Sequence, residues 1–231
     1  MEENFNIENI GIPELGNFVQ FVGCALCDKK CDGPGEVLAR AGKVLHPGII
    51  CPHYENFRSV NITDNYVTFW GGVFSNFYPC KITIEEDWWG NPIEPVTFKS
   101  SEQCFMWYKA TNFNDEETAE DILRAKTPKE AKSLGRKVKN FNEEEWLETR
   151  EAAMWNAVYQ KFKQNPELCR YLINPVTETR QFVEGSPFDK IWGVGISWDD
   201  PAVADEKNWK GENLLGKTLD KVRRALIEEK Q

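Results

Sequence analysis

The stretch that most constrains the fold lies near the middle of the chain, at residues 98–110. Ser100 followed by Gln103 has the Ser-x-x-Gln form of a capping box, which predicts a helix beginning just after Ser100. Glu102 then falls in the first turn, where the helix dipole favours a negative charge. Lys109 lies seven residues later, so both side chains leave the same face of the helix. A carboxylate, an amine and the aromatic residues between them could together form a site.

These features also have a purely structural explanation, because first-turn glutamates complement the dipole and an aromatic helix usually belongs to a core. The tryptophans favour a site. The chain of 231 residues has nine of them, and several lie beside Gly, Asn or Pro, as at Trp70, Trp88 and Trp192. Tryptophan in a loop can simply pack, yet it also provides a flat wall for a ring-shaped ligand.

The net charge and the cysteine content limit the classes of protein to which this chain can belong. The net charge of −9 argues against broad, sequence-independent binding of nucleic acid, which needs a positive surface, but it is compatible with a small basic pocket. The sequence has no apolar run long enough to cross a membrane and no signal-peptide pattern. Seven cysteines without a secretion signal fit a reducing compartment. We therefore expect a cytoplasmic protein that does not bind membranes.

Residues 1–60 differ from the remainder and form a candidate extension. They are rich in Gly and Pro, lack a convincing long helix, and hold four of the seven cysteines and both histidines. The Cys-x-x-Cys pair, followed by further cysteines, suits tetrahedral ligation of a structural zinc ion. The predicted ligands are Cys24, Cys27, Cys31 and Cys51, with His46 and His53 as alternatives. The other interpretation is a loop-rich segment with free cysteines and no metal.

Strands are expected on either side of the central helix. Residues 66–70, 81–84 and 96–98 have β-rich composition, and Phe182–Glu184 is a further strand-like segment. The loop between the first two strands carries Asn76 among aromatic residues, where its amide could either bind a ligand or satisfy its own turn.

Five further helices are predicted after the central one. Asn114 or Asp115 opens residues 116–125, Thr127 caps a short helix with proline at its first position, and Asn142 caps a long helix to about Gln164. A short helix follows at 166–173, and a final helix runs from Asn213 to about Ile227. The predicted apolar stripe of the long helix is Leu147, Met154, Val158 and Phe162.

The segment 185–195 joins an acid, Asp189, to Trp192 and Gly193. Glycine lets the backbone approach a ligand closely, although Asp189 capping a tight turn would explain the segment equally well. Together with the motifs above, this segment completes an ordered set that resembles the YbiA/NADAR family over about residues 66–228. The motifs are Ser75-Asn-Phe77, Ser101-Glu-Gln-x4-Tyr-Lys109, Gly135-Arg136, Trp146 with Met154, Asp189-x2-Trp-Gly-x-Gly195 and Lys210-Gly-x-Asn-x-Leu-Gly-Lys-x-Leu-x3-Arg223.

The resemblance implies a mostly helical α+β domain with a small β component, spanning residues 61–231 and preceded by the Cys-rich extension. It implies an N-glycosidase, a hydrolase that cleaves a bond between ribose C1′ and nitrogen. Two substrates belong to the family: phosphorylated ribosylaminopyrimidine intermediates of riboflavin synthesis, and ADP-ribosylated guanine in nucleic acid. No cofactor is expected in catalysis.

The resemblance also suggests roles for individual residues. The family's acid maps onto Glu102, which would stabilise positive charge at C1′ or activate water, as carboxyl groups do in glycoside hydrolysis. Asp189 would position water or ribose hydroxyls. The expected substrate-binding residues are Asn76, Phe77, Arg136, Trp146, Trp192, Gly193, Asn213 and Lys217, with Trp146 and Trp192 stacking on the base. Arg136, Lys109 and Lys217 are candidates for phosphate contact.

Several alternatives stay open. If the sugar ring opens, Lys109 could form a Schiff base with C1′. The pocket could instead bind ADP-ribose or NAD without cleaving it, although a pure binder has no need of Glu102 beside an anionic ligand. A metal-bearing interaction protein is a third interpretation. Some family members have an acid where this chain has Val194, so that role is unavailable here. Six cations between residues 126 and 139 could form a basic rim or a solvated helix face.

Overall fold

The computed structural model describes residues 59–87 and 90–230. The candidate zinc ligands lie outside these residues, so the zinc site stays a prediction. Within the described residues, no group of three or more His, Cys, Asp or Glu side chains is placed to hold a metal ion. No helix in this part of the chain is long and apolar enough to cross a membrane.

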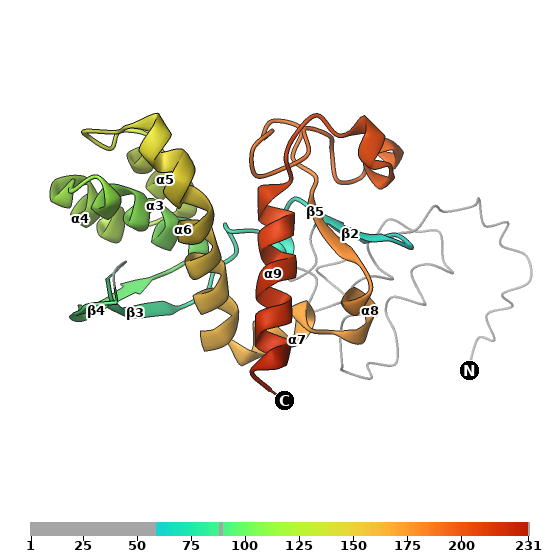
Figure 1. The fold of residues 1–231 in the computed structure, drawn as a ribbon, viewed down its shortest axis with the longest axis horizontal. Coiled ribbons are helices and arrows are strands. Elements are labelled where there is room, and N and C mark those ends of the chain that lie inside the picture. Colours follow the sequence, from blue (N-terminus) through green and yellow to red (C-terminus); the bar gives the residue numbers. More distant parts are fainter. Residues whose placement is uncertain (1–58, 88–89, 231) are drawn as a thin grey trace, which may run out of the picture.

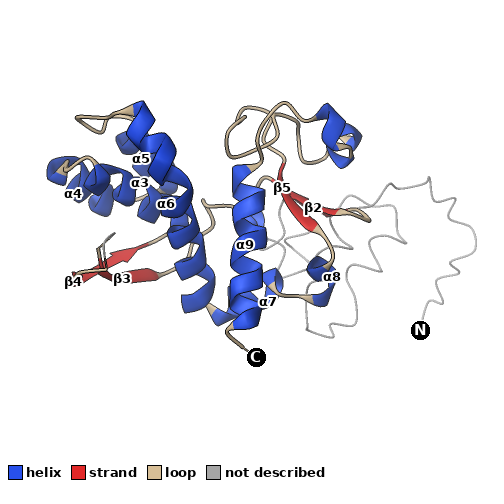
Figure 2. Ribbon diagram, viewed as in Figure 1, coloured by secondary structure: helices blue, strands red, loops and turns tan. Residues whose placement is uncertain are grey.

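The structure confirms the predicted α+β class, with helices predominating (Figure 2). The helices are α3 (Ser101–Asn112), α4 (Glu116–Arg124), α5 (Pro128–Gly135), α6 (Glu143–Gln164), α7 (Pro166–Leu172), α8 (Pro175–Glu178) and α9 (Leu214–Glu228). The strands are β1 (Val60–Ile62), β2 (Tyr66–Phe69), β3 (Ile82–Glu86), β4 (Pro92–Phe98) and β5 (Gln181–Glu184). Short 3-10 helices occupy Gly72–Phe74, Pro201–Ala204 and Glu206–Asn208.

The predicted helix starts are confirmed, with one difference in how the caps are built. Ser100 Oγ accepts a hydrogen bond from Gln103 N at 3.2 Å, and Thr127 caps α5 in the same way. The Gln103 side chain, however, reaches back to Lys99 N rather than to Ser100 N. Asn142 accepts from the first-turn amides of α6. These side chains satisfy amides that have no partner inside the helix, which fixes where each helix begins.

Two small sheets lie apart from one another (Figures 1 and 2). Strands β3 and β4 form an antiparallel pair, and a three-stranded sheet has the order β1-β2-β5. Within the latter, β2 and β5 are parallel, and Phe69 pairs with Glu184. This parallel pairing brings the end of β5 beside the glycine-rich loop that follows β2.

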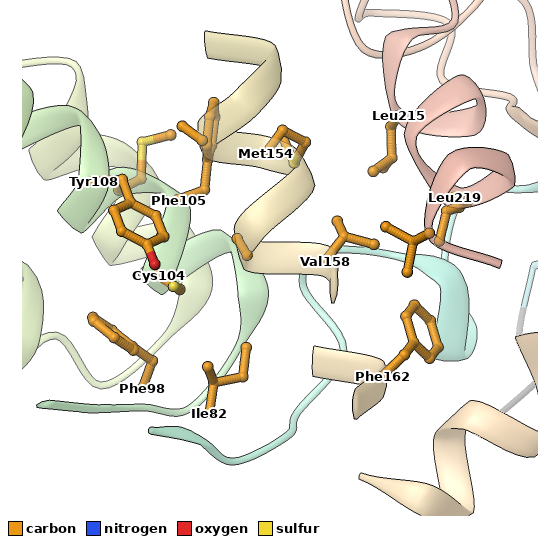
Figure 3. Packing of buried hydrophobic residues seen from close by; sticks show 14 of the residues in the cluster. Ile82, Phe98, Cys104, Phe105, Tyr108, Met154, Val158, Phe162, Leu215 and Leu219 are labelled. Carbon is orange, nitrogen blue, oxygen red and sulfur yellow. The ribbon is translucent and has the colours of Figure 1, made fainter. Parts of the chain in front are cut away.

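Helix α9 connects the two halves of the fold, because it packs against α6 on one side and β5 on the other (Figure 1). Figure 3 shows the core between α3, α6 and α9, where Met154 and Val158 of α6 lie between Phe105 of α3 and Leu215 of α9. Helices α3, α5, α6 and α9 and strand β5 all contribute buried residues to this core.

One predicted core residue is wrong. Leu147 is 50% exposed, whereas Met154, Val158 and Phe162 of the same stripe are buried. At that end of α6 the contact with α3 and its following loop is made by the neighbouring residue, Trp146, which packs against Phe105. Helical periodicity therefore identified the stripe but not the point at which it leaves the core.

Candidate active site

Two connected hollows form the candidate site. The inner cavity has a volume of about 140 Å³ and includes Glu102 of α3, Glu184 of β5 and Asp189 of the following loop. The outer cleft, of about 810 Å³, shares Glu184 and Asp189 with it and extends over the loop after β2. Residues lining both are Ser75, Phe77, Lys132, Glu184 and Asp189. The structure thus brings Glu102 and Asp189 together, as the sequence predicted.

Glu102 is 4% exposed and lies in the first turn of α3. Its backbone N–H donates to Asn76 O at 3.0 Å, which joins the helix start to the loop after β2. Burial raises the pKa of its carboxyl group to about 7; the positive charges of Lys132 and Arg136 oppose this rise, and the negative charge of Asp189 adds to it. Near neutral pH the group can therefore change protonation state readily.

Glu184 is the site residue that sequence reasoning missed. Its side chain lines both hollows, and its Oε2 atom is buried without a hydrogen-bond partner among the described residues. Burial raises its pKa to about 8, and the negative charges of Asp189 and Glu102 contribute to the rise. The signal that could have found it is an acid at the end of a short apolar strand, immediately before a glycine-rich loop.

Asp189 combines the two roles that the sequence left open. Its Oδ1 atom accepts hydrogen bonds from Ile191 N at 3.0 Å and Trp192 N at 2.9 Å, so it caps the turn. Its Oδ2 atom lies 4.0 Å from Lys132 Nζ and belongs to the lining of both hollows. One carboxylate oxygen thus holds the loop while the other can face a ligand.

Asn76 lines the inner cavity, but its side-chain amide is already engaged by the protein. Nδ2 donates to Met154 Sδ at 3.0 Å, and Oδ1 accepts from Ser101 Oγ at 3.0 Å. The fully buried Lys161 donates to Ser75 O at 2.8 Å and so holds the preceding residue of the same loop. A side-chain amide has two N–H groups and two oxygen lone pairs, so Asn76 keeps one donor and one acceptor position for a ligand.

Both predicted tryptophans pack against Phe105. Trp192 lines the inner cavity and meets the Phe105 ring edge-on, at 5.2 Å between centroids. Trp146 packs 5.4 Å from the same ring, is only 9% exposed, and is not among the described residues that line either hollow. The predicted stacking contact is thus available to Trp192, while Trp146 contacts Phe105, which itself lines the inner cavity.

Lys109 is placed away from the carboxyl groups, contrary to the expectation from helix spacing. Its Nζ atom donates to Gly135 O at 3.0 Å and lies 4.1 Å from the centre of the Phe141 ring. Burial lowers its pKa. Among the described residues that line the two hollows, Lys109 is absent. A shared helix face does not fix the end of a four-carbon side chain, and here that end turns to the C-terminus of α5.

Three other predicted binding residues, Lys217, Asn213 and Gly193, are not among the described residues that line the two hollows. Lys217 is exposed on α9 and lines neither hollow of the described structure. Asn213, with a left-handed φ of 54°, donates to Phe182 O at 2.9 Å and accepts from Glu184 N at 3.0 Å. The carbonyl oxygen of Gly193 accepts a hydrogen bond from Asn213 N. A Cβ atom at position 193 would lie 2.8 Å from Glu184 O, so this position favours glycine. Asn213 and Gly193 therefore position β5, and neither is among the described residues that line the two hollows.

The mouth of the outer cleft combines aromatic rings and cations. Trp70 is 48% exposed and Phe188 85% exposed, with 6.5 Å between their ring centroids. Lys132 and Arg136, from the predicted basic rim, line the cleft, and Phe77 lies beneath Lys132. Another cation of that run, Lys139, pairs with Glu117 instead. The rim is therefore built from part of the run.

Comparison with known proteins agrees with this arrangement. The profile of the NADAR domain matches residues 68–227. Protein irg-1 of Caenorhabditis elegans is 36% identical over 189 residues, covering 75% of this chain and 85% of that protein. N-glycosidase R617 of Acanthamoeba polyphaga mimivirus is 35% identical, covering 70% of this chain and 96% of that protein.

A riboflavin biosynthesis protein of Vibrio vulnificus, VVA0006, is 31% identical over 68% of this chain but only 36% of its own length. The solution structure of Escherichia coli YbiA superposes with a TM-score of 0.56, at 28% identity, covering 76% of this chain and 93% of that one. The motifs predicted the same relationship, and the matched region contains every residue of the inner cavity. The chain belongs to the NADAR domain family.

Proposed function

We propose that this protein is an N-glycosidase that hydrolyses the bond between ribose C1′ and nitrogen. The proposal rests on the inner cavity, which is lined by the buried residue Glu102 together with Asp189 and Trp192. The names of two relatives agree with it, N-glycosidase R617 of the mimivirus and N-glycosidase YbiA of Shigella boydii. The reaction needs carboxyl groups and water, and no cofactor.

The chemistry follows from the charge that develops on the sugar. As the C1′–N bond lengthens, C1′ becomes oxocarbenium-like, and a nearby carboxylate stabilises it or takes a proton from the attacking water. Glu102 serves this purpose, because burial keeps its pKa near 7 and its ionised form is not solvated by bulk water. The free oxygen of Asp189 holds the ribose hydroxyls or the water. Trp192 stacks on the base and fixes the flat leaving group.

The phosphate groups of the substrate bind at Lys132 and Arg136. Both line the outer cleft, and both lower the pKa of Glu102 through their charge, so they lie within electrostatic range of the reacting centre. An ammonium and a guanidinium suit phosphate oxygens. This placement replaces Lys109 and Lys217 as phosphate ligands. It suits a ribosylaminopyrimidine phosphate, and the name of the Vibrio vulnificus relative agrees with a riboflavin-related substrate.

ADP-ribosylated guanine in nucleic acid is the other substrate of this chemistry. The outer cleft is several times larger than the inner cavity and carries the exposed rings of Trp70 and Phe188, which suits a longer ligand. The net charge of −9 limits contact with a nucleic acid to the Lys132–Arg136 edge. The scissile bond is the same in both cases.

The test is a mass-spectrometric turnover assay on two substrates, a ribosylaminopyrimidine phosphate and an oligonucleotide carrying ADP-ribosylguanine. We expect the wild type to cleave one of them and Glu102→Gln to lose at least about 100-fold in rate, the usual contribution of a general acid or base. Glu148→Gln, an exposed carboxylate on α6, is the matched control and should keep full rate. Binding of ADP-ribose without cleavage of either substrate would instead identify a binding module.

A further inference from the structure

We propose that Glu184 is the general acid of the reaction, the group that donates a proton to the departing nitrogen. This inference rests on the proposed N-glycosidase function and assigns a second catalytic residue within it. Glu184 lies at the boundary between the two hollows, since it lines the inner cavity with Glu102 and the outer cleft with Lys132. Glu184 is thus one of the few residues that a leaving group can meet from either hollow.

Glu184 Oε2 is buried and has no hydrogen-bond partner among the described residues. A buried polar atom without a partner costs free energy, more so when it is charged, so native structures keep few of them without a functional reason. A protonated carboxyl group, which donates to a ligand that enters the cavity, resolves this cost. A carboxylate serving only the fold would be expected to accept bonds from neighbouring amides.

The backbone of Glu184 is held at both its N–H group and its carbonyl oxygen. Its N–H donates to Asn213 Oδ1 at 3.0 Å, and its carbonyl oxygen accepts from Ser186 N and Val194 N, each at 3.0 Å. Asn213 reaches this position through a left-handed backbone, and Gly216 lies so close to the Asn213 amide that a Cβ there would approach it to 2.5 Å. Such fixation suits a residue that has to meet a reacting atom at a set position.

The charges around Glu184 also favour its protonated form. The charged groups that interact with Glu184 are Asp189 from the following loop, Glu102 from α3 and Lys132 from α5. Two of the three are negative, and burial acts in the same direction, so the pKa of Glu184 is raised to about 8 while that of Glu102 is about 7. Two carboxyl groups whose environments separate their pKa values are typical of an acid and a base acting together.

Bond cleavage in this mechanism is coupled to two proton transfers. The C1′–N bond breaks with its electron pair going to nitrogen, and the carboxyl proton of Glu184 passes to the leaving base. Water forms the new C1′–O bond and gives its proton to the carboxylate of Glu102. Glu184 ends ionised and Glu102 protonated, and exchange with solvent water restores both. The rate should therefore rise as Glu102 ionises near pH 7 and fall as Glu184 ionises near pH 8.

The experiment compares wild type, Glu184→Gln and the exposed control Glu148→Gln on two substrates. One is a ribosylaminopyrimidine 5′-phosphate, whose leaving nitrogen needs a proton. The other is p-nitrophenyl riboside 5′-phosphate, whose leaving group departs without one. We expect Glu184→Gln to lose about 100-fold or more in kcat on the first, to stay within a few-fold on the second, and to lose the fall in rate at alkaline pH. Infrared difference spectra of wild type against Glu184→Gln should show a protonated carboxyl group at pH 7.

Each contrary outcome is distinct. Equal losses of Glu184→Gln on both substrates would show a structural role and overturn the assignment, and so would an ionised Glu184 carboxylate in the infrared spectrum at pH 7. In both cases the cleavage rates of the wild type would still support the N-glycosidase function. If the wild type cleaves neither these substrates nor ADP-ribosylguanine, the proposed function fails and the role of Glu184 in it falls as well.

Discussion

Replacing Glu102 by glutamine should make the folded protein more stable at alkaline pH, even though it abolishes the proposed reaction. The side chain is 4% exposed, and burial is the main reason that its pKa is raised from 4.5 to about 7. The folded state therefore keeps this proton over a range in which the unfolded chain has released it. Unfolding then releases a proton, so the free energy of unfolding falls as pH rises between those two values.

The magnitude follows from the size of the shift. A rise of about 2.5 units, at about 1.4 kcal/mol per unit, corresponds to about 3 kcal/mol of stability. This contribution is fully present below pH 4.5 and is lost as pH passes through about 7. Glutamine carries no charge, so Glu102→Gln should match the wild type at pH 4.5 and exceed it by up to about 3 kcal/mol at pH 9.

Urea unfolding of both proteins at several pH values from 4.5 to 9 measures this difference directly. Glu148→Gln, at an exposed position, should change the free energy of unfolding by no more than about 0.5 kcal/mol throughout. If the curves for wild type and Glu102→Gln stay parallel across this range, Glu102 is not a desolvated carboxyl group. The assignment of Glu102 as a group that titrates near neutral pH would then be refuted.

Two further outcomes are expected. Lys161 is fully buried, and its pKa is lowered from 10.5 to about 8, so between these pH values the unfolded chain holds a proton that the folded state has released. The free energy of unfolding should therefore rise by about 3 kcal/mol between pH 8 and 10.5. Lys161→Met should abolish that rise in urea titrations. Trp192→Ala should weaken substrate binding by about 1–3 kcal/mol through loss of base stacking, measured as KM, while Trp192→Phe should keep most of the affinity. A Trp192→Ala variant with unchanged KM would contradict the stacking role.

The helix starts could be predicted from sequence because they depend on local contacts. Ser100, Thr127 and Asn142 each accept a hydrogen bond from an amide two or three residues away. A cap of this kind leaves its pattern in four consecutive residues, whatever the rest of the chain does. Glu102 was found for the same reason, since its place in the first turn follows directly from the cap at Ser100.

Glu184 could not be found in this way because its position depends on distant pairing. Its strand is parallel to β2, and Glu184 pairs with Phe69, far away in the sequence. Seen alone, Phe182-Val-Glu184 is too short to show which residue faces a cavity. Asn213, which fixes the backbone of Glu184, belongs to a third segment. The second carboxyl of the cavity therefore emerges only when three separate parts of the chain are brought together.

The side chain of Lys109 shows a different limit. Helical spacing places its Cα on the same face as Glu102, but its amine bonds to Gly135 O, from the helix packed against α3. The cation that does line the cavity, Lys132, comes from that neighbouring helix instead. Periodicity assigns a residue to a face, whereas the position of a flexible charged end depends on which carbonyls and rings the neighbouring elements present to it.

The site and the core place opposite demands on the same elements. The inner cavity gathers the carboxyl groups of Glu102, Glu184 and Asp189 around Lys132, the single lysine among its described lining residues. Burying ionisable carboxyls in this way lowers stability at neutral and alkaline pH. The cost is offset by the adjoining core, where Phe105 and Leu215 contribute both to that cavity and to the apolar cluster between α3, α6 and α9. The packing of α9 against both α6 and β5 therefore helps to hold in place the strand that carries Glu184.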